Sequence, residues 1–306
     1  MNKISIIGAG RVGETTAQTI AQQGMCNEVV LLDVREGAAA GAALDIRQTA
    51  PFFGFDVTVT GGSDPALLRD SELVIITAGS PRKPGMSRSD VLDINRAVID
   101  SILDEVLEYA PDCLLLLVTN PVDVLTHHAW KRTGWDRSRV FGQAGVLDAS
   151  RMASFIAEET SLSIKDINTM VIGGHGDLMV PLTRFSSING LPASTFLDQD
   201  TVERVNNKTR HGGAEVLELR QTSSAYNAPA AAVATMVDAI ANNRRHVLPC
   251  VCILDGEYDQ QDITTGVPAV LGGKGIEQVI ELPLDEAEQE GFLASIESIR
   301  ADLKLL

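Results

Sequence analysis

The chain has 306 residues, of which 44% are apolar, so it can form one large or two ordinary domains with a sizeable core. Its 41 acidic and 25 basic residues give a formal net charge of −16 at pH 7. That charge argues against a nucleic-acid partner, because phosphate binding needs a basic surface. The apolar runs, such as 114–118, have the length of a strand and are too short to cross a bilayer.

In the first half, short apolar runs alternate with helical patterns, as they do in βαβ units. The expected strands are 3–7, 28–33, 56–60, 73–77 and 114–119, and the expected helices are 12–23, 37–49, 65–68, 88–109 and 122–133. This order predicts an α/β fold with a Rossmann-type, doubly wound parallel sheet. Right-handed crossovers place the loops that follow the strands along one edge, where ligands bind.

The second half has a mixed pattern. The expected helices are 151–159, 201–219, 228–242 and 284–305, and the expected strands are 164–172, 179–181, 183–187, 245–254, 268–272 and 275–281. This pattern predicts a mixed α+β domain that packs closely on the first, because no flexible linker separates the halves. We place the boundary within 142–150 and divide the chain into residues 1–145 and 146–306.

The cysteines and the N-terminus indicate the compartment. Cys26, Cys113, Cys250 and Cys252 show no Cys-x-x-Cys spacing, which argues against a zinc site, and we expect no metal. The N-terminus lacks the basic region and long apolar core of an export signal. We therefore expect a cytoplasmic protein with reduced cysteines and no membrane partner.

The basic residues comprise only 7 Lys but 18 Arg. An acidic surface that is poor in Lys suits a protein that stays soluble in high salt, where charge repulsion is screened. This composition favours a salt-adapted protein, and an ordinary acidic cytoplasmic enzyme is the alternative.

A Gly-x-Gly-x-x-Gly motif follows the first expected strand and opens a helix. Its residues are Gly8, Ala9, Gly10, Arg11, Val12 and Gly13. Glycines allow the tight turn and the close approach of a pyrophosphate, and the helix N-terminus supplies N–H groups for the phosphates. Asp33, 20 residues after Gly13, is placed to accept hydrogen bonds from ribose hydroxyls and to repel a 2′-phosphate. The motif favours NAD over NADP, although Arg35 nearby could accommodate that phosphate. A glycine-rich turn without a ligand is the alternative.

The loop 79–88 follows the fourth expected strand, at the ligand edge of the sheet. Two glycines and two prolines bracket Arg82, Lys83 and Arg88, a composition that suits a mobile lid. The alternative is a solvated basic loop.

Further along, His175 lies in the sequence GGHGD at 173–177, behind a strand-like run. An imidazole flanked by small residues can exchange a proton with a substrate near neutral pH, although a buried structural His is the competing interpretation.

Taken together, these motifs resemble the lactate/malate dehydrogenase superfamily, and within it the lactate-dehydrogenase-like malate dehydrogenases. The matching segments are GAGRVG at 8–13, LLD at 31–33, ITAGSPRKPGMSR at 76–88, VTNPVD at 118–123, GVLDASR at 145–151 and GGHGD at 173–177. They occur in the family's order and spacing over essentially the whole chain. The resemblance implies that residues 1–145 bind NAD and that residues 146–306 form the catalytic domain.

The resemblance also implies a role for each site residue. His175 matches the proton acceptor and Asp148 the carboxylate that holds its imidazole. Arg151 matches the bidentate clamp on the C1 carboxylate, and Arg88 the lid residue that polarises the reacting carbonyl. Asn120 matches the residue that hydrogen-bonds the substrate hydroxyl. Asn95, the Val118 backbone and Asn120 match contacts to NAD.

Arg82 is expected to determine the substrate. In the family, an Arg at this position accompanies dicarboxylic substrates, whereas a Gln accompanies pyruvate. The physical reason is that oxaloacetate brings a second carboxylate into a closed site, where an unpaired charge is costly. Arg82 therefore predicts reversible oxidation of (S)-malate to oxaloacetate, a tricarboxylic acid cycle reaction. The resemblance also implies a homo-oligomer, with a tetramer favoured over a dimer. A lactate or other 2-hydroxy-acid dehydrogenase, and a catalytically idle NAD-binding relative, are the alternatives.

Overall fold

The computed structural model describes residues 1–35, 37–80, 88–221 and 223–306. Its helices are α1 (Arg11–Gln22), α2 (Ala38–Gln48), α3 (Ala50–Phe53), α4 (Arg88–Tyr109), α5 (Val122–Thr133), α6 (Gly145–Thr160), α7 (Gln199–Arg220), α8 (Asn227–Ala241) and α9 (Glu286–Leu303). Its strands are β1 (Lys3–Ile7), β2 (Glu28–Leu32), β3 (Thr58–Gly62), β4 (Leu73–Ile76), β5 (Leu114–Leu117), β6 (Val140–Gln143), β7 (Ile167–Asn168), β8 (Val171–Ile172), β9 (Val180–Pro181), β10 (Ser187–Ile188), β11 (Leu191–Pro192), β12 (His246–Asp255), β13 (Gln261–Gly272) and β14 (Gly275–Val279).

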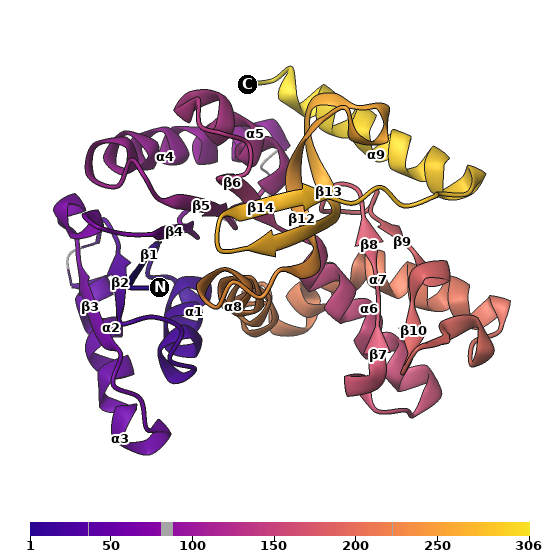
Figure 1. Ribbon diagram of the computed structural model, residues 1–306, viewed down its shortest axis with the longest axis horizontal. Coiled ribbons are helices and arrows are strands. Elements are labelled where there is room, and N and C mark those ends of the chain that lie inside the picture. Colours follow the sequence, from indigo (N-terminus) through magenta and orange to yellow (C-terminus); the bar gives the residue numbers. More distant parts are fainter. Residues whose placement is uncertain (36, 81–87, 222) are drawn as a thin grey trace.

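Six strands of the first half form a parallel array in the order β3-β2-β1-β4-β5-β6. The helices α4 and α5 pack together on one face of this array, and α1 packs with α8 on the other (Figure 1). Because both faces are covered, β4 and β5 are apolar and buried along their whole length. The strand order reverses between β1 and β4, and ligands of such sheets bind at the carboxyl ends of the strands there.

The strands of the second half continue the same sheet. β12 pairs antiparallel with β6 through Cys250 opposite Gln143 and Val251 opposite Gly142, and β13 and β14 follow it. The sheet therefore joins both halves of the chain, and a single large hydrophobic core runs through them. A smaller cluster around Met152 and Val205 lies where α6 packs on α7.

Most expected elements are present within one or two residues of their expected ends, and the α/β fold class is confirmed. The strand β6 was not expected, because its four residues include Gly142 and Gln143 and show no alternation. The expected strand 164–172 is wrong as one element, since a 3₁₀ turn and two short strands replace it, and much of 183–187 is a 3₁₀ turn. The β13 strand begins seven residues before the expected position 268, and α6 begins six residues before the expected position 151.

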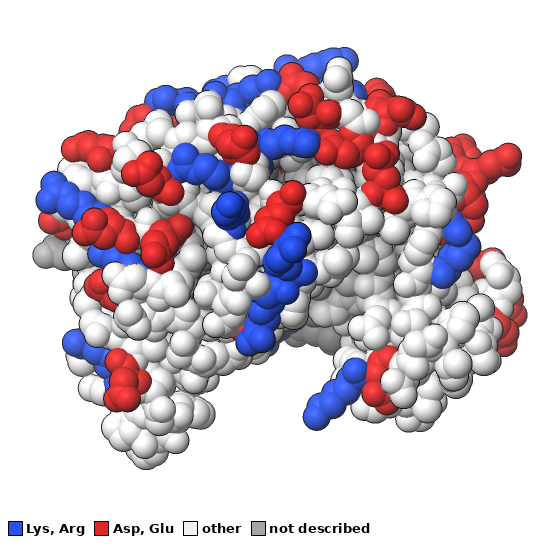
Figure 2. Space-filling model, in the orientation of Figure 1, with Lys and Arg blue, Asp and Glu red and all other residues white. Residues whose placement is uncertain are grey.

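Acidic side chains gather on the α9 side of the face shown in Figure 2, while basic and acidic side chains alternate over the α4 side. Within the part of the chain that the structure describes, no helix has the length and apolarity that a membrane span requires. Cys250 and Cys252 are buried and free on β12, and burial raises the pKa of the Cys250 thiol to about 12.

Candidate active site

The glycine-rich turn joins β1 to α1. Gly8 has a φ of +109°, and a Cβ on Gly13 would overlap the carbonyl oxygen of Gly8, so neither position accepts a side chain. The Thr77 hydroxyl donates to that carbonyl oxygen at 2.9 Å, which fixes the turn to the end of β4. A Cβ on Gly10 would meet no described atom within 4 Å, so a ligand can reach the backbone at the N-terminus of α1.

Asp33 follows β2 and faces the same turn. Its Oδ2 accepts a hydrogen bond from the Ala9 N–H at 2.9 Å. The guanidinium of Arg35 donates from Nε to Oδ1 at 2.9 Å and from Nη2 to Oδ2 at 3.2 Å. This side-chain hydrogen bond from Arg35 is the main cause that lowers the pKa of Asp33, against the effect of burial. The carboxylate is therefore ionised at neutral pH, as an acceptor for ribose hydroxyls must be.

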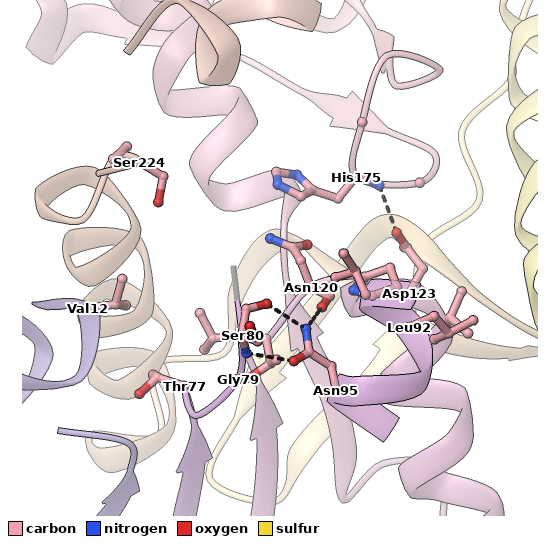
Figure 3. A pocket seen from close by; sticks show the side chains of 18 of the residues that line it. Val12, Thr77, Gly79, Ser80, Leu92, Asn95, Asn120, Asp123, His175 and Ser224 are labelled. Atoms are coloured by element: carbon pink, nitrogen blue, oxygen red, sulfur yellow. Dashed lines mark hydrogen bonds between the residues drawn. The ribbon is translucent and has the colours of Figure 1, made fainter. Parts of the chain in front are cut away.

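Asn95 of α4 links the loops that follow β4 and β5. Its Oδ1 accepts from the Ser80 N–H at 2.7 Å, and its Nδ2 donates to the carbonyl oxygens of Ser80 at 3.2 Å and Asn120 at 2.7 Å (Figure 3). The side chain is almost fully buried. Asn95 therefore holds together the two loops at the root of the segment that carries Arg82. Asn95 was expected to contact NAD, and in this structure its amide groups bond to the backbone.

His175 lies in the loop after β8, and Asp148 lies in the first turn of α6. The Nδ1 of His175 is 2.8 Å from Oδ2 of Asp148, and their side chains are 19% and 2% exposed. A carboxylate only accepts hydrogen bonds, so Nδ1–H is the donor and Nε2 is the nitrogen that remains for a substrate. Burial works to lower the pKa of His175, but the charge of Asp148 and its hydrogen bond outweigh burial, and the pKa is raised.

Arg151 lies one helical turn beyond Asp148. Its Nη1 donates to Oδ1 of Asp148 at 2.9 Å, and its side chain is 16% exposed. A Cβ on Gly213 of α7 would lie 3.5 Å from its Nη2, an ordinary van der Waals distance, so α7 passes close to the guanidinium. One carboxylate therefore holds both the imidazole of His175 and the guanidinium of Arg151. The pairing of Asp148 with His175 was predicted, whereas the hydrogen bond from Arg151 to Asp148 was not.

Asp123 is a site residue for which the sequence analysis assigned no role. It lies on α5, is 5% exposed, and its Oδ2 accepts from the backbone N–H of His175 at 2.8 Å. Burial raises the pKa of Asp123 to about 6, against the hydrogen bond from His175. Its place in the VTNPVD segment was the available signal, but the sequence could not show that its carboxylate reaches the loop at 173–177.

A cavity of about 1280 Å³ extends from the glycine-rich turn to His175. In Figure 3, the imidazole of His175 and the amide of Asn120 point into the same space, and Val12 and Ser224 lie across it. Further lining residues come from elements to which the sequence analysis gave no part in the site: Ser223, Ala225 and Tyr226 before α8, and Ser298, Ile299, Asp302 and Leu305 at the C-terminal end of the chain. Asp148 and Arg151 are not among the described residues that line this cavity.

The expected cofactor contacts that line this cavity are Gly10, Arg11, Val12, Gly13, Asn95, Val118 and Asn120. The guanidinium of Arg11 lies 5.2 Å from the ring centroid of Tyr226, so a residue of the glycine-rich turn contacts the segment before α8. Arg82 lies outside the described residues, and of Arg88 the structure describes only the backbone, at the start of α4. Their expected roles stay predictions.

Comparisons with known proteins agree with this geometry. The family model for the lactate/malate dehydrogenase NAD binding domain matches residues 2–142, and the model for the lactate/malate dehydrogenase alpha/beta C-terminal domain matches residues 145–306. The chain is 62% identical over 306 residues to a malate dehydrogenase of Thioalkalivibrio sulfidiphilus, with 100% of both chains covered.

Two solved structures are similar over nearly their whole length. The malate dehydrogenase of Cryptosporidium parvum has a TM-score of 0.96 and 36% identity, and the match covers 100% of this chain and 99% of that one. The lactate dehydrogenase of Cryptosporidium parvum, solved with lactic acid and nicotinamide adenine dinucleotide, has a TM-score of 0.95 and 36% identity, with 99% and 97% covered. The chain therefore belongs to the lactate/malate dehydrogenase family, which is an NAD-dependent oxidoreductase family.

Proposed function

We propose that this chain is an NAD-dependent malate dehydrogenase that reversibly oxidises (S)-malate to oxaloacetate, with His175 as the proton acceptor. The observation that carries the proposal is that one cavity reaches from the open backbone at Gly10 to the imidazole of His175. A dinucleotide on the glycine-rich turn and a small acid beside the imidazole would share that space.

The residues at the turn fit NAD. Gly10 leaves the backbone open to a pyrophosphate, and the N-terminus of α1 supplies N–H groups and a partial positive charge. Asp33 presents an ionised carboxylate 2.9 Å from the Ala9 N–H, in the position from which it can accept from ribose hydroxyls. Asn95, Val118 and Asn120 form the wall between this turn and His175. Bound NAD would supply the acceptor for the hydride that leaves C2 of malate.

His175 performs the proton transfer in this proposal. Its Nε2 accepts the proton of the C2 hydroxyl, and in reverse the imidazolium donates a proton to the carbonyl oxygen of oxaloacetate. Asp148 holds Nδ1–H at 2.8 Å, which sets the tautomer and stabilises the cationic ring. Asn120 points into the same space (Figure 3) and would hydrogen-bond the substrate hydroxyl, so that the proton faces Nε2.

Three arginines bind the diacid in this proposal. Arg151 clamps the C1 carboxylate, Arg82 pairs with the second carboxylate, and Arg88 polarises the reacting carbonyl. For Arg151, support comes from Asp148, whose carboxylate holds both this guanidinium and the imidazole of His175. For Arg82 and Arg88, support comes from their matching positions in the family's motif.

A direct assay tests the proposal. NADH absorbance is followed with oxaloacetate and with pyruvate, and a specificity constant that is higher for oxaloacetate supports malate as the substrate. A preference for pyruvate would indicate a lactate dehydrogenase. NADH binding without turnover of any small 2-keto acid would indicate an idle relative.

We also propose that the chain is a cytoplasmic homotetramer, with residues 1–145 as the NAD-binding domain and 146–306 as the catalytic domain. Phe52 and Phe53 of α3, 86% and 58% exposed, support self-association, because a second copy could bury them. Light scattering should give a mass near four times 32.7 kDa, and a mass near twice 32.7 kDa would indicate a dimer instead.

Salt adaptation is a further part of the proposal, and the net charge of −16 supports it. Molar KCl should raise the melting temperature well above its low-salt value, because salt screens repulsion among the acidic side chains. An equal osmolality of sorbitol is the control, and a melting temperature that does not depend on salt would contradict the proposal.

A further inference from the structure

The loop that carries His175 is held by three consecutive backbone N–H groups, each bonded to a different element. Gly173 donates to the carbonyl oxygen of Gly266 on β13 at 2.8 Å, and Gly174 donates to the hydroxyl of Ser295 on α9 at 2.7 Å. His175 donates to Oδ2 of Asp123 on α5 at 2.8 Å. Of these three acceptors, only Asp123 can carry a charge.

Asp123 occupies a place in which a carboxylate is costly. It is 5% exposed, and its Oδ1 is buried with no hydrogen-bond partner among the described residues. An ionised group in such a place persists when other interactions favour it, because burial removes its hydration. The hydrogen bond from the His175 N–H is one such interaction. A positive charge on the imidazole of the same residue is the second.

We propose that Asp123 is a positioning residue for His175 that both fixes its main chain and favours the protonated form of its imidazole; the inference rests on the proposed function of His175. Two carboxylates then act on one residue from opposite ends. Asp148 reaches the ring from α6, and Asp123 reaches the backbone from α5. The guanidinium of Arg151, also on α6, opposes the protonated ring.

The charges around the imidazole agree with this assignment. The carboxylates of Asp148 and Asp123 both raise the pKa of His175, against burial and Arg151. A neutral acceptor at position 123 would keep the loop in place but remove one of the two negative charges. The contribution of the charge can therefore be separated from that of the hydrogen bond.

Three variants make this separation. Asp123→Asn keeps an oxygen that can accept from the His175 N–H and removes the charge, while Asp123→Ala removes both. Ser295→Ala is the matched control, because it removes the neighbouring anchor of the same loop without changing any charge. If Asp123 only anchored the loop, its variants would behave like Ser295→Ala.

The first measurement is the titration of the His175 ring by NMR in the full-length protein without ligand, with His175→Gln used to assign the signal. We expect the midpoint to fall in Asp123→Asn and to stay at the wild-type value in Ser295→Ala. The midpoint in the pH profile of oxaloacetate reduction should fall in the same way in Asp123→Asn. The turnover of this variant at its own pH optimum should stay within about threefold of wild type. Asp123→Ala should lose roughly tenfold to hundredfold in turnover, because the ring is no longer held in place.

An Asp123→Asn protein whose His175 titrates as in wild type would overturn the inference, whether or not Asp123→Ala folds. The NMR measurement needs no substrate. If wild type failed to reduce oxaloacetate, the proposed function would fall, while the titration would still decide whether Asp123 acts on the imidazole.

Discussion

Asp148 and His175 are 27 residues apart in the sequence, and Oδ2 of Asp148 accepts a hydrogen bond from Nδ1 of His175 at 2.8 Å. The other oxygen of the same carboxylate accepts from Arg151 at 2.9 Å. A single buried carboxylate therefore sets the position of both the proposed base and the proposed clamp on the substrate. Any change at Asp148 should disturb proton transfer and substrate binding together.

The raised pKa of His175 predicts opposite pH dependences for the two directions of the reaction. Malate oxidation needs the neutral ring, so its kcat/KM should rise as pH increases through a pKa above the ordinary value of 6.5, whereas oxaloacetate reduction should fall over the same range. In Asp148→Asn both transitions should move to lower pH, and kcat should drop about 100-fold or more. Initial rates between about pH 5 and about pH 10 measure both effects. Asp56→Asn, an exposed change outside the residues that line the cavity, is the control, and unshifted profiles in Asp148→Asn would contradict the pairing.

Arg82→Gln should change the choice of substrate. Loss of the guanidinium leaves the second carboxylate of oxaloacetate unpaired in a closed site, which costs about 2–5 kcal/mol. The ratio of kcat/KM for oxaloacetate to that for pyruvate should therefore fall roughly 30-fold or more. Lys83→Gln removes a neighbouring positive charge and should leave the ratio near its wild-type value. A ratio unchanged by Arg82→Gln would show that another residue selects the substrate.

Asp33→Ser should weaken the preference for NADH over NADPH. The change removes the carboxylate that accepts from ribose hydroxyls and repels a 2′-phosphate, and it releases Arg35 from its pair with Asp33. We expect KM for NADH to rise about tenfold, a loss of roughly 1.4 kcal/mol, and KM for NADPH to fall. Arg35→Gln keeps the carboxylate and should preserve the preference for NADH. Equal discrimination in Asp33→Ser and wild type would count against the assignment of Asp33.

Asp123→Asn should change how stability depends on pH. The pKa of Asp123 rises from 3.8 to about 6 on folding, so between these pH values the folded state holds a proton that the unfolded chain has released. The wild-type free energy of unfolding should therefore lose about 3 kcal/mol from this group as pH rises through that window. The variant lacks this loss. Its free energy of unfolding relative to that of wild type should therefore increase between about pH 4 and about pH 7, and urea unfolding measures this difference.

Asp136→Asn is the control for this pH dependence. A side-chain hydrogen bond from Ser138 is the main cause that lowers the pKa of the exposed Asp136, so its removal should not reproduce the rise. If the free energies of unfolding of wild type and Asp123→Asn changed in parallel with pH, the Asp123 carboxyl would titrate in the folded protein as it does in the unfolded chain.

The first half of the fold could be predicted because its signals are local. Apolar runs of strand length alternate with helices, and the glycine-rich turn stands between the first pair, so the doubly wound sheet follows from order alone. The strand β6 gave no such signal, since its burial depends on β5 and β12 on either side of it and on α5 packed against it. The fold class, predicted from the order of the elements, and the family, predicted from the motifs, are both confirmed.

The candidate site, like the fold, could be predicted from the sequence only in part. His175, Asp148 and Arg151 were predicted as a group, and the structure brings them into contact. The sequence assigned no role to Asp123, because a carboxylate one residue into a helix is also a common helix-start residue.

By itself, the sequence determined the chemistry that is available: an imidazole among glycines, a carboxylate three residues before an arginine, and a turn that can accept a pyrophosphate. Only the tertiary structure decided which of these groups meet, that β12 extends the first sheet, and that Asp123 anchors the peptide of the proposed base. The reason is physical. Residue type and spacing set local conformation, whereas the position of a buried charge depends on the packing of helices and strands that are distant in the chain.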